Sequence, residues 1–104
     1  MLTIKNRSSK ISPGGVVTLP LSARRALGME PKKGARVTVS IDGRAVVLHV
    51  TSDRAGSRVS PGGQMEMVGE ARRLLETGEA RHFWLEADDE HRRVALNPYG
   101  AAPA

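Results

Sequence analysis

The side chains best suited to chemistry in this chain of 104 residues are arginines and lysines in its first half. Arg24 and Arg25 are adjacent, and Ala23, Ala26 and Leu27 around them have the spacing of one helical face, so at least one guanidinium should point to solvent. A guanidinium binds phosphate bidentately or reads guanine O6 and N7 in the major groove. The sequence therefore predicts DNA contact. The candidate DNA-binding residues are Lys5, Arg7, Lys10, Arg24, Arg25, Lys32 and Lys33, and the weaker candidates are Arg72 and Arg73.

A structural role is the alternative for these arginines. Arg24 could pair with a carboxylate such as Glu70 or Asp42 instead of with DNA. The pair recurs later in the chain as Arg72 and Arg73. This recurrence favours the structural role, because two similar structural units would each need such a pair.

Charge is distributed unevenly along the chain. Residues 1–50 contain nine basic and two acidic side chains, a net charge of +7, whereas residues 51–104 have a net charge of −2. Clustered Lys and Arg gain affinity for a polyanion by releasing its condensed counterions. Double-stranded DNA is therefore the expected partner of the first half, and a protein partner would suit the acidic second half.

Other polar groups do not assemble into a recognisable site. The run Ser12-Pro13-Gly14-Gly15 lacks the glycine spacing and the Lys-Ser/Thr of a nucleotide-binding loop, so it is expected to be a plain turn. Residues 82–91 include two histidines and four carboxylates, but no HExxH or other metal-ligand spacing. No nucleophile, base and orienting group can be combined. We expect no enzymatic activity, no cofactor and no metal site.

The elements that must position the arginines are encoded twice. Residues 11–28 recur as residues 59–76, with Ser-Pro-Gly-Gly and Ala-Arg-Arg-x-Leu in matching places forty-eight positions apart. Two copies are too few for a solenoid, and units of about fifty residues are marginally stable alone. We therefore expect one pseudo-twofold body with a shared core.

Each repeat is expected to fold as a strand, a short helix and a β-hairpin. In the first repeat, residues 16–19 have strand propensity, Ser22 is the expected N-cap, and Gly28 is the expected left-handed stop of the helix. Residues 37–41 alternate apolar with polar side chains, as a half-buried strand does. Asp42-Gly43 then predicts a two-residue hairpin turn.

The expected fold class is mostly β with short helices. Its organisation is a basic repeat at 1–50, a polar linker at 51–58, a degenerate acidic repeat at 59–98, and a tail at 99–104. The chain has no cysteine and no apolar run long enough to cross a bilayer, so a cytoplasmic protein without membrane contact is expected.

The first repeat resembles the AbrB/MazE/SpoVT family of bacterial DNA-binding domains. The resemblance covers residues 10–50 and rests on Leu19-Pro20, Arg24-Arg25 and Leu27-Gly28, with Gly34 also in register. It implies a swapped-hairpin barrel, in which the two repeats interlock their strands. A double-psi β-barrel is the alternative topology, because it uses the same elements in the same order.

The resemblance implies a DNA-binding transcriptional regulator, with antitoxin activity and homodimer formation as further implications. Val16 and Gln64 stand where the family commonly has an arginine after the turn glycine, and the second repeat lacks the Thr-Leu-Pro segment. We therefore expect the first repeat to dominate DNA binding. The alternative function is a protein-interaction or assembly module built on the same barrel.

Overall fold

The computed structural model describes residues 2–4 and 9–100 of the chain. Its elements in order are β1 (Leu2–Ile4), β2 (Val16–Thr18), α1 (Leu21–Ala26), β3 (Ala35–Asp42), β4 (Ala45–Thr51), β5 (Ser57–Val59), β6 (Gln64–Glu66), α2 (Gly69–Glu76), the 3₁₀ turn η1 (Glu79–Arg81), β7 (Phe83–Asp88) and β8 (Arg93–Pro98). The protein is thus mostly β with two short helices, as the sequence predicted. Neither helix is long and apolar enough to cross a membrane.

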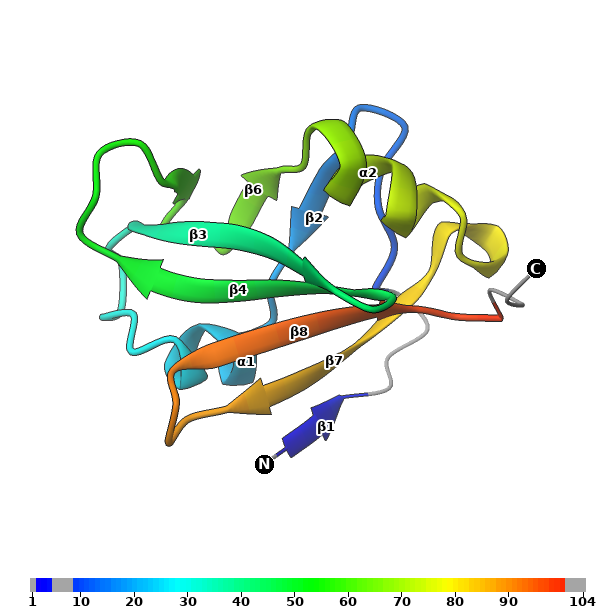
Figure 1. The fold of residues 1–104 in the computed structure, drawn as a ribbon. Coiled ribbons are helices and arrows are strands. Elements are labelled where there is room, and N and C mark those ends of the chain that lie inside the picture. The colour runs from blue at the N-terminus through cyan, green and yellow to red at the C-terminus, as the bar shows by residue number, and fades with distance from the viewer. Residues whose placement is uncertain (1, 5–8, 101–104) are drawn as a thin grey trace.

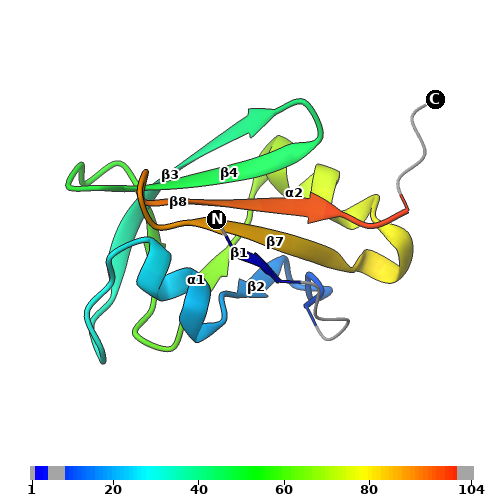
Figure 2. The same cartoon turned by 90° about the horizontal axis from the view of Figure 1, so that it is seen from below.

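The strands form two separate sheets. Six strands are ordered β1-β7-β8-β4-β3-β5, and β2 pairs with β6 alone. Figure 1 shows the β2–β6 pair and α2 to one side of the long central strands, and Figure 2 shows α1 and β2 on the same side of β8. The two sheets do not join into a closed barrel.

Among the described strands, four pairings join the halves of the chain, and two of them, β2–β6 and β4–β8, pair residues that the repeat relates. In the β2–β6 pair, Val17 lies opposite Met65, and in the β4–β8 pair, Val47 lies opposite Ala95. Each of these pairs joins residues forty-eight positions apart, and both ladders are antiparallel. Each ladder is therefore centred on a pair of equivalent residues from the two repeats, as expected where a pseudo-twofold axis passes through it.

One hydrophobic core lies between the sheets and the helices. It contains side chains from both repeats, including Val17 and Met65 of the small sheet and Phe83 of the large one. Ala23, Ala26 and Leu27 of the first helical segment are buried there, as are Ala71 and Leu75 of the second. The predicted face of the first helix is therefore confirmed, and side chains of both repeats share one core.

The helix ends differ in part from the prediction. Gly28 has φ +77, and the N–H groups of Gly28 and Met29 donate to the carbonyl oxygens of Arg25 and Arg24, so the left-handed stop is confirmed. The expected N-cap Ser22 is wrong, because α1 begins at Leu21 after an extended Pro20 and has no side-chain cap. The Pro20 carbonyl accepts the first intrahelical hydrogen bond, from the Arg24 N–H at 3.0 Å, so the helix has begun before Ser22 could cap it.

The two β-hairpins differ in turn length. In the first, Asp42 pairs with Ala45, so Gly43 and Arg44 form a two-residue turn and Asp42 is still part of the strand. In the second, Asp88 pairs with Arg93, which leaves four residues in the turn. In β4 and β8 the repeat relates Leu48 to Leu96 and Val46 to Val94. Their partners across the hairpins are Val39 and Ile41 in β3 and Leu85 and Ala87 in β7, so these residues also correspond.

Candidate nucleic-acid interface and the arginine-bound turns

The two Ser-Pro-Gly-Gly segments form the same turn. The Ser12 hydroxyl accepts a hydrogen bond from the Val16 N–H at 3.0 Å, and the Gly15 N–H donates to the Ser12 carbonyl at 2.9 Å. Residues 60–64 repeat these contacts at the same distances. A turn is therefore present in both repeats where the sequence predicted it, and the N–H groups of Gly15 and Val16, like those of Gly63 and Gln64, donate inside it.

Each turn is held by an arginine from the other repeat. Arg72 donates through Nη2 to the Pro13 carbonyl at 3.0 Å, and Arg24 donates through Nη1 to the Pro61 carbonyl at 3.2 Å. A Cβ placed on Gly15 would lie 3.0 Å from Arg72 Cζ, so the guanidinium packs directly over the glycine. Arginine and turn are thus partners across the pseudo-twofold axis.

These contacts give Arg24 a structural role, but with partners other than the carboxylates suggested by the sequence. Its partners are carbonyl oxygens, Pro61 O and also Leu19 O, which accepts from Nε at 3.1 Å, and not the carboxylates of Glu70 or Asp42. The ion pair considered as the alternative for Arg24 is therefore wrong. Short β-turns leave carbonyl groups unpaired at the surface, and a guanidinium with five donors can satisfy them.

The neighbouring arginines have a different environment. Arg25 and Arg73 are exposed, whereas Arg24 and Arg72 are half-buried. Arg25 lines a surface groove with Leu2, Ala87 and Asp89 at the β1–β7 edge of the sheet. Of each adjacent pair, the second arginine is therefore the one available to a ligand.

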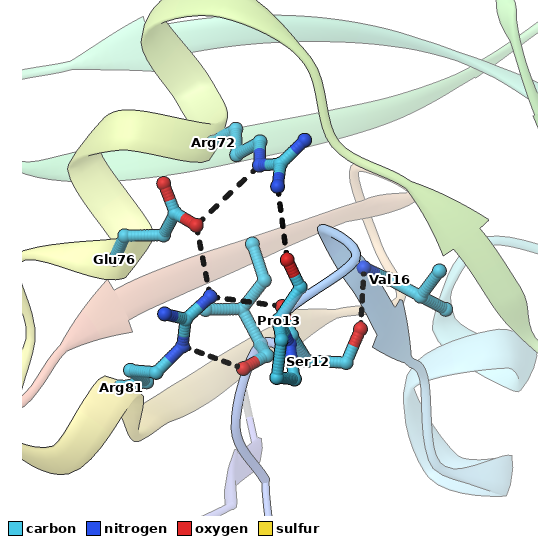
Figure 3. Close-up of polar contacts among 7 residues, drawn as sticks. Ser12, Pro13, Val16, Arg72, Glu76 and Arg81 are labelled. Atoms are coloured by element: carbon cyan, nitrogen blue, oxygen red, sulfur yellow. Dashed lines mark hydrogen bonds and ion pairs between the residues drawn. The ribbon is translucent and has the colours of Figure 1, made fainter.

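Arg81 and Glu76 complete the contacts around the first turn (Figure 3). Glu76 Oε2 accepts from Arg81 Nη2 at 2.8 Å and from Arg72 Nε at 3.4 Å, and Arg81 also donates to the carbonyls of Ile11 and Ser12 at 3.2 and 2.9 Å. Sequence reasoning missed Arg81, which has a left-handed backbone with φ 64. The repeat gave no signal for it, because the corresponding loop of the first repeat differs in length.

A group of basic residues gathers at one end of the sheet, where β3 begins and β5 pairs with it. Arg36 lies directly opposite Arg58 in the β3–β5 ladder, and both are exposed. Arg36 Nη1 reaches the Gly56 carbonyl at 3.0 Å, in the loop that also carries the exposed Arg54. We call this the basic end; it consists of Lys32, Lys33, Arg36, Arg54 and Arg58.

The structure divides the predicted DNA-binding residues between two sheet edges. Lys32 and Lys33 are exposed at the basic end, where Lys33 also contacts Glu30 at 2.9 Å. Lys10 lies opposite His82, next to the β7 edge, and so does not join them. Lys5 and Arg7 lie outside the described residues, as do positions 101–104 of the tail. Sequence reasoning missed Arg36, Arg54 and Arg58, which only the strand register brings together.

The acidic hairpin turn of the second repeat has its own internal contacts. Ligand atoms of Asp88, Glu90 and His91 lie within 4.8 Å of one another. His91 Nδ1 is 2.8 Å from Asp88 Oδ2, and this hydrogen bond holds the pKa of the Asp88 carboxyl below its usual value. Because exposed acidic groups commonly cluster in this way, the arrangement by itself does not define a metal site.

No protein-family model, curated protein or solved structure matches this chain.

Proposed function

We propose that the protein is a DNA-binding transcriptional regulator, and that its basic end contacts the phosphate backbone. The observation that supports this is the direct cross-strand pairing of Arg36 with Arg58. Like charges directly opposite each other in a sheet destabilise it. A bound polyanion would remove this cost, so the pair is better suited to the bound state than to the free one.

The surroundings of this pair favour the same ligand. Lys32 and Lys33 come from the loop before β3, and Arg54 comes from the loop between β4 and β5, so two segments far apart in the sequence contribute cations. Lysines and arginines on several segments suit a duplex, whose phosphates extend over a long surface. Arg25 is the candidate for a further contact from α1, since Arg24 is engaged in the turn.

A swapped-hairpin arrangement of the two repeats, with the strands in two separate sheets, is part of this proposal. It is supported by two of the cross-repeat pairings, β2 with β6 and β4 with β8, because interlocked repeats exchange strands in this way. A homodimer would place two basic ends on one duplex and raise its affinity through symmetric half-sites.

The experiment is fluorescence anisotropy with a labelled duplex from the upstream region of the gene and with a scrambled duplex, over a salt series. The test variant is Arg36→Ala/Arg58→Ala. We expect affinity for both duplexes to fall steeply with salt, and the slope of log K against log[salt] to decrease by about two in the variant, about one for each lost phosphate contact. Preference for the upstream duplex would identify a sequence-specific regulator.

The matched control is Arg44→Ala/Arg92→Ala, which removes the exposed arginines of the two hairpin turns. It should leave the salt slope unchanged. Arg24→Ala is unsuitable as a test of DNA contact, because it removes the turn contact with Pro61 as well. Absence of binding by the folded protein at low salt would refute the proposal, and an equal loss in the control would refute the placement at the basic end.

A further inference from the structure

The two repeats differ in whether a strand covers the outer edge of their first hairpin strand, β3 in the first repeat and β7 in the second. In the second repeat, β1 pairs antiparallel with β7, with Leu2 opposite Ala87 and Ile4 opposite Leu85. In the first repeat, the corresponding stretch of β3 is residues 39–41, and β5 pairs only with residues 35–37. Among the residues that the structure describes, no strand pairs with β3 beyond Val37 on this side.

The hairpin register shows that this edge offers free backbone groups. In a two-residue hairpin the residues that flank the turn form a hydrogen-bonded pair, and such pairs then alternate along the ladder. Since Asp42 pairs with Ala45, the even-numbered residues of β3 bond to β4. The N–H and C=O groups of Val39 and Ile41 therefore point to the open side, as those of an edge strand do.

Burial follows the presence of the covering strand. Leu85 and Ala87, beside β1, are 0% and 3% exposed. Val39 is half-buried and Ile41 is 38% exposed, although they occupy the corresponding positions. Beside them lies a groove of about 510 Å³, formed with the start of α2 and lined by Met67, Val68, Glu66 and Glu70 among others. Val68 is 63% exposed.

The loop between β4 and β5 cannot cover this edge in the way that β1 covers β7. β1 belongs to a segment that precedes the first turn, whereas only five residues separate β4 from β5. A connection of that length is used up in passing from one strand to the next, since a residue spans at most about 3.5 Å. The first repeat therefore has a strand-binding edge without a strand.

We propose that this edge and groove bind an extended peptide of a partner protein, which adds a strand antiparallel to β3 at residues 39–41. The peptide carries apolar side chains at alternate positions, as Leu2 and Ile4 do in β1, and at least one Lys or Arg near them. Main-chain hydrogen bonds to an exposed edge provide affinity in this mode of recognition, and pockets for alternate side chains provide specificity.

The negative charge of the groove favours a basic peptide, rather than a second copy of the same chain, as its occupant. Glu66 and Glu70 are exposed and line the groove. A twofold pairing of β3 with β3 of another copy would bring four carboxylates together, which is unfavourable at short distance. A basic peptide would instead be attracted to them. The acidic second repeat thus contributes α2 and its carboxylates to a site on the first repeat.

The probe for the test is a fluorescein-labelled peptide of sequence MLTIKNR, because this segment contains the strand that covers the corresponding edge. Anisotropy is measured with the full chain at low salt. The variant Glu66→Lys/Glu70→Lys should weaken binding at least tenfold, because it reverses the groove charge at two exposed positions. Glu90→Lys, an exposed position in the opposite hairpin turn, should not.

Ile41→Pro is the second test variant. Proline removes the N–H that faces the open edge and leaves the β4 ladder intact, so it should abolish binding in a folded protein. A peptide N-methylated at its isoleucine should also fail to bind, because the residues opposite Val39 and Ile41 are the ones whose N–H groups face the edge, as those of Leu2 and Ile4 do in β1. Circular dichroism of each variant checks that the fold is retained.

Three outcomes would overturn the proposal. The first is no binding at millimolar peptide, and the second is binding that all groove variants retain, which would mean that the peptide displaces β1 from β7. The third is concentration-dependent dimerisation that Ile41→Pro abolishes, which would assign the edge to a second copy. None of these outcomes involves DNA, so the proposed regulator function stands or falls separately.

Discussion

Arg24 reaches across the centre of the molecule and donates a hydrogen bond to the Pro61 carbonyl oxygen at 3.2 Å. Its repeat-related partner Arg72 makes the same contact with Pro13 at 3.0 Å. Each repeat therefore supplies both a turn and the arginine that holds the turn of the other repeat. The contacts also pack each guanidinium against a turn glycine, beside the central β2–β6 ladder.

The first prediction concerns the stability provided by these arginines. Arg24→Ala should lower the free energy of unfolding by about 1–3 kcal/mol, because it removes the donor to the exposed Pro61 carbonyl and also the donor in the part-buried contact with the Leu19 carbonyl. Arg25→Ala should change it by no more than about 0.5 kcal/mol, since Arg25 is exposed. Urea denaturation followed by circular dichroism measures both.

Arg72 and Arg73 provide an independent copy of this comparison. Arg72→Ala should also destabilise, but Arg81 still donates to the Ser12 carbonyl of the same turn, so its effect should be the smaller of the two. Equal stability of Arg24→Ala and Arg25→Ala would show that the cross-repeat contacts contribute nothing.

Local patterns in the sequence predicted the elements and much of the core. The spacing of Ala23, Ala26 and Leu27 correctly identified the buried helical face, and Gly28 correctly marked the end of the helix. Such features depend on a few neighbouring residues, so one sequence contains enough information to read them. The N-cap at Ser22 failed because Pro20 is the N-cap, so the helix begins two residues earlier.

The candidate site depended on contacts that no local pattern contains. Adjacent arginines on a short helix look equivalent in the sequence, yet one binds a turn carbonyl and the other faces solvent. The pairing of Arg36 with Arg58 follows from the β3–β5 register, which is a tertiary property. The open edge of β3 became visible only by comparing it with the β1-covered edge of β7.

The second prediction concerns the turn glycines. Gly63 has φ +86, and a Cβ there would lie 2.5 Å from the Leu19 carbonyl oxygen, which is backbone. Gly15 has φ +83, but its nearest atoms belong to the flexible Arg72 side chain at 3.0 Å. Gly15→Ala should therefore cost about 1–3 kcal/mol through the left-handed backbone alone, and Gly63→Ala should cost more.

Gly62 is the matched control for this comparison. It precedes Gly63, and a Cβ there would meet only the Ser60 hydroxyl at 3.9 Å. Gly62→Ala should be neutral or stabilise by about 0.4–1 kcal/mol, because alanine restricts the unfolded chain more than glycine does. If thermal unfolding ranks Gly62→Ala as the most damaging of the three, the turn geometry described above is incorrect.

The third prediction concerns pH and the second hairpin turn. The hydrogen bond from His91 stabilises the ionised Asp88 carboxylate and lowers its pKa below the usual 3.8. A carboxyl whose pKa is depressed in the folded state contributes stability above its unfolded pKa, and this contribution is lost as the pH falls through the folded value.

His91→Ala should raise the pKa of Asp88, as measured by NMR titration of its carboxyl carbon. Some depression should remain, because the backbone N–H of residue 91 also donates to Asp88 Oδ1 at 3.3 Å. His49→Ala removes an imidazole that does not shift this pKa and should leave the titration unchanged. An Asp88 pKa that is the same with and without the His91 side chain would rule out the imidazole as the cause of the shift.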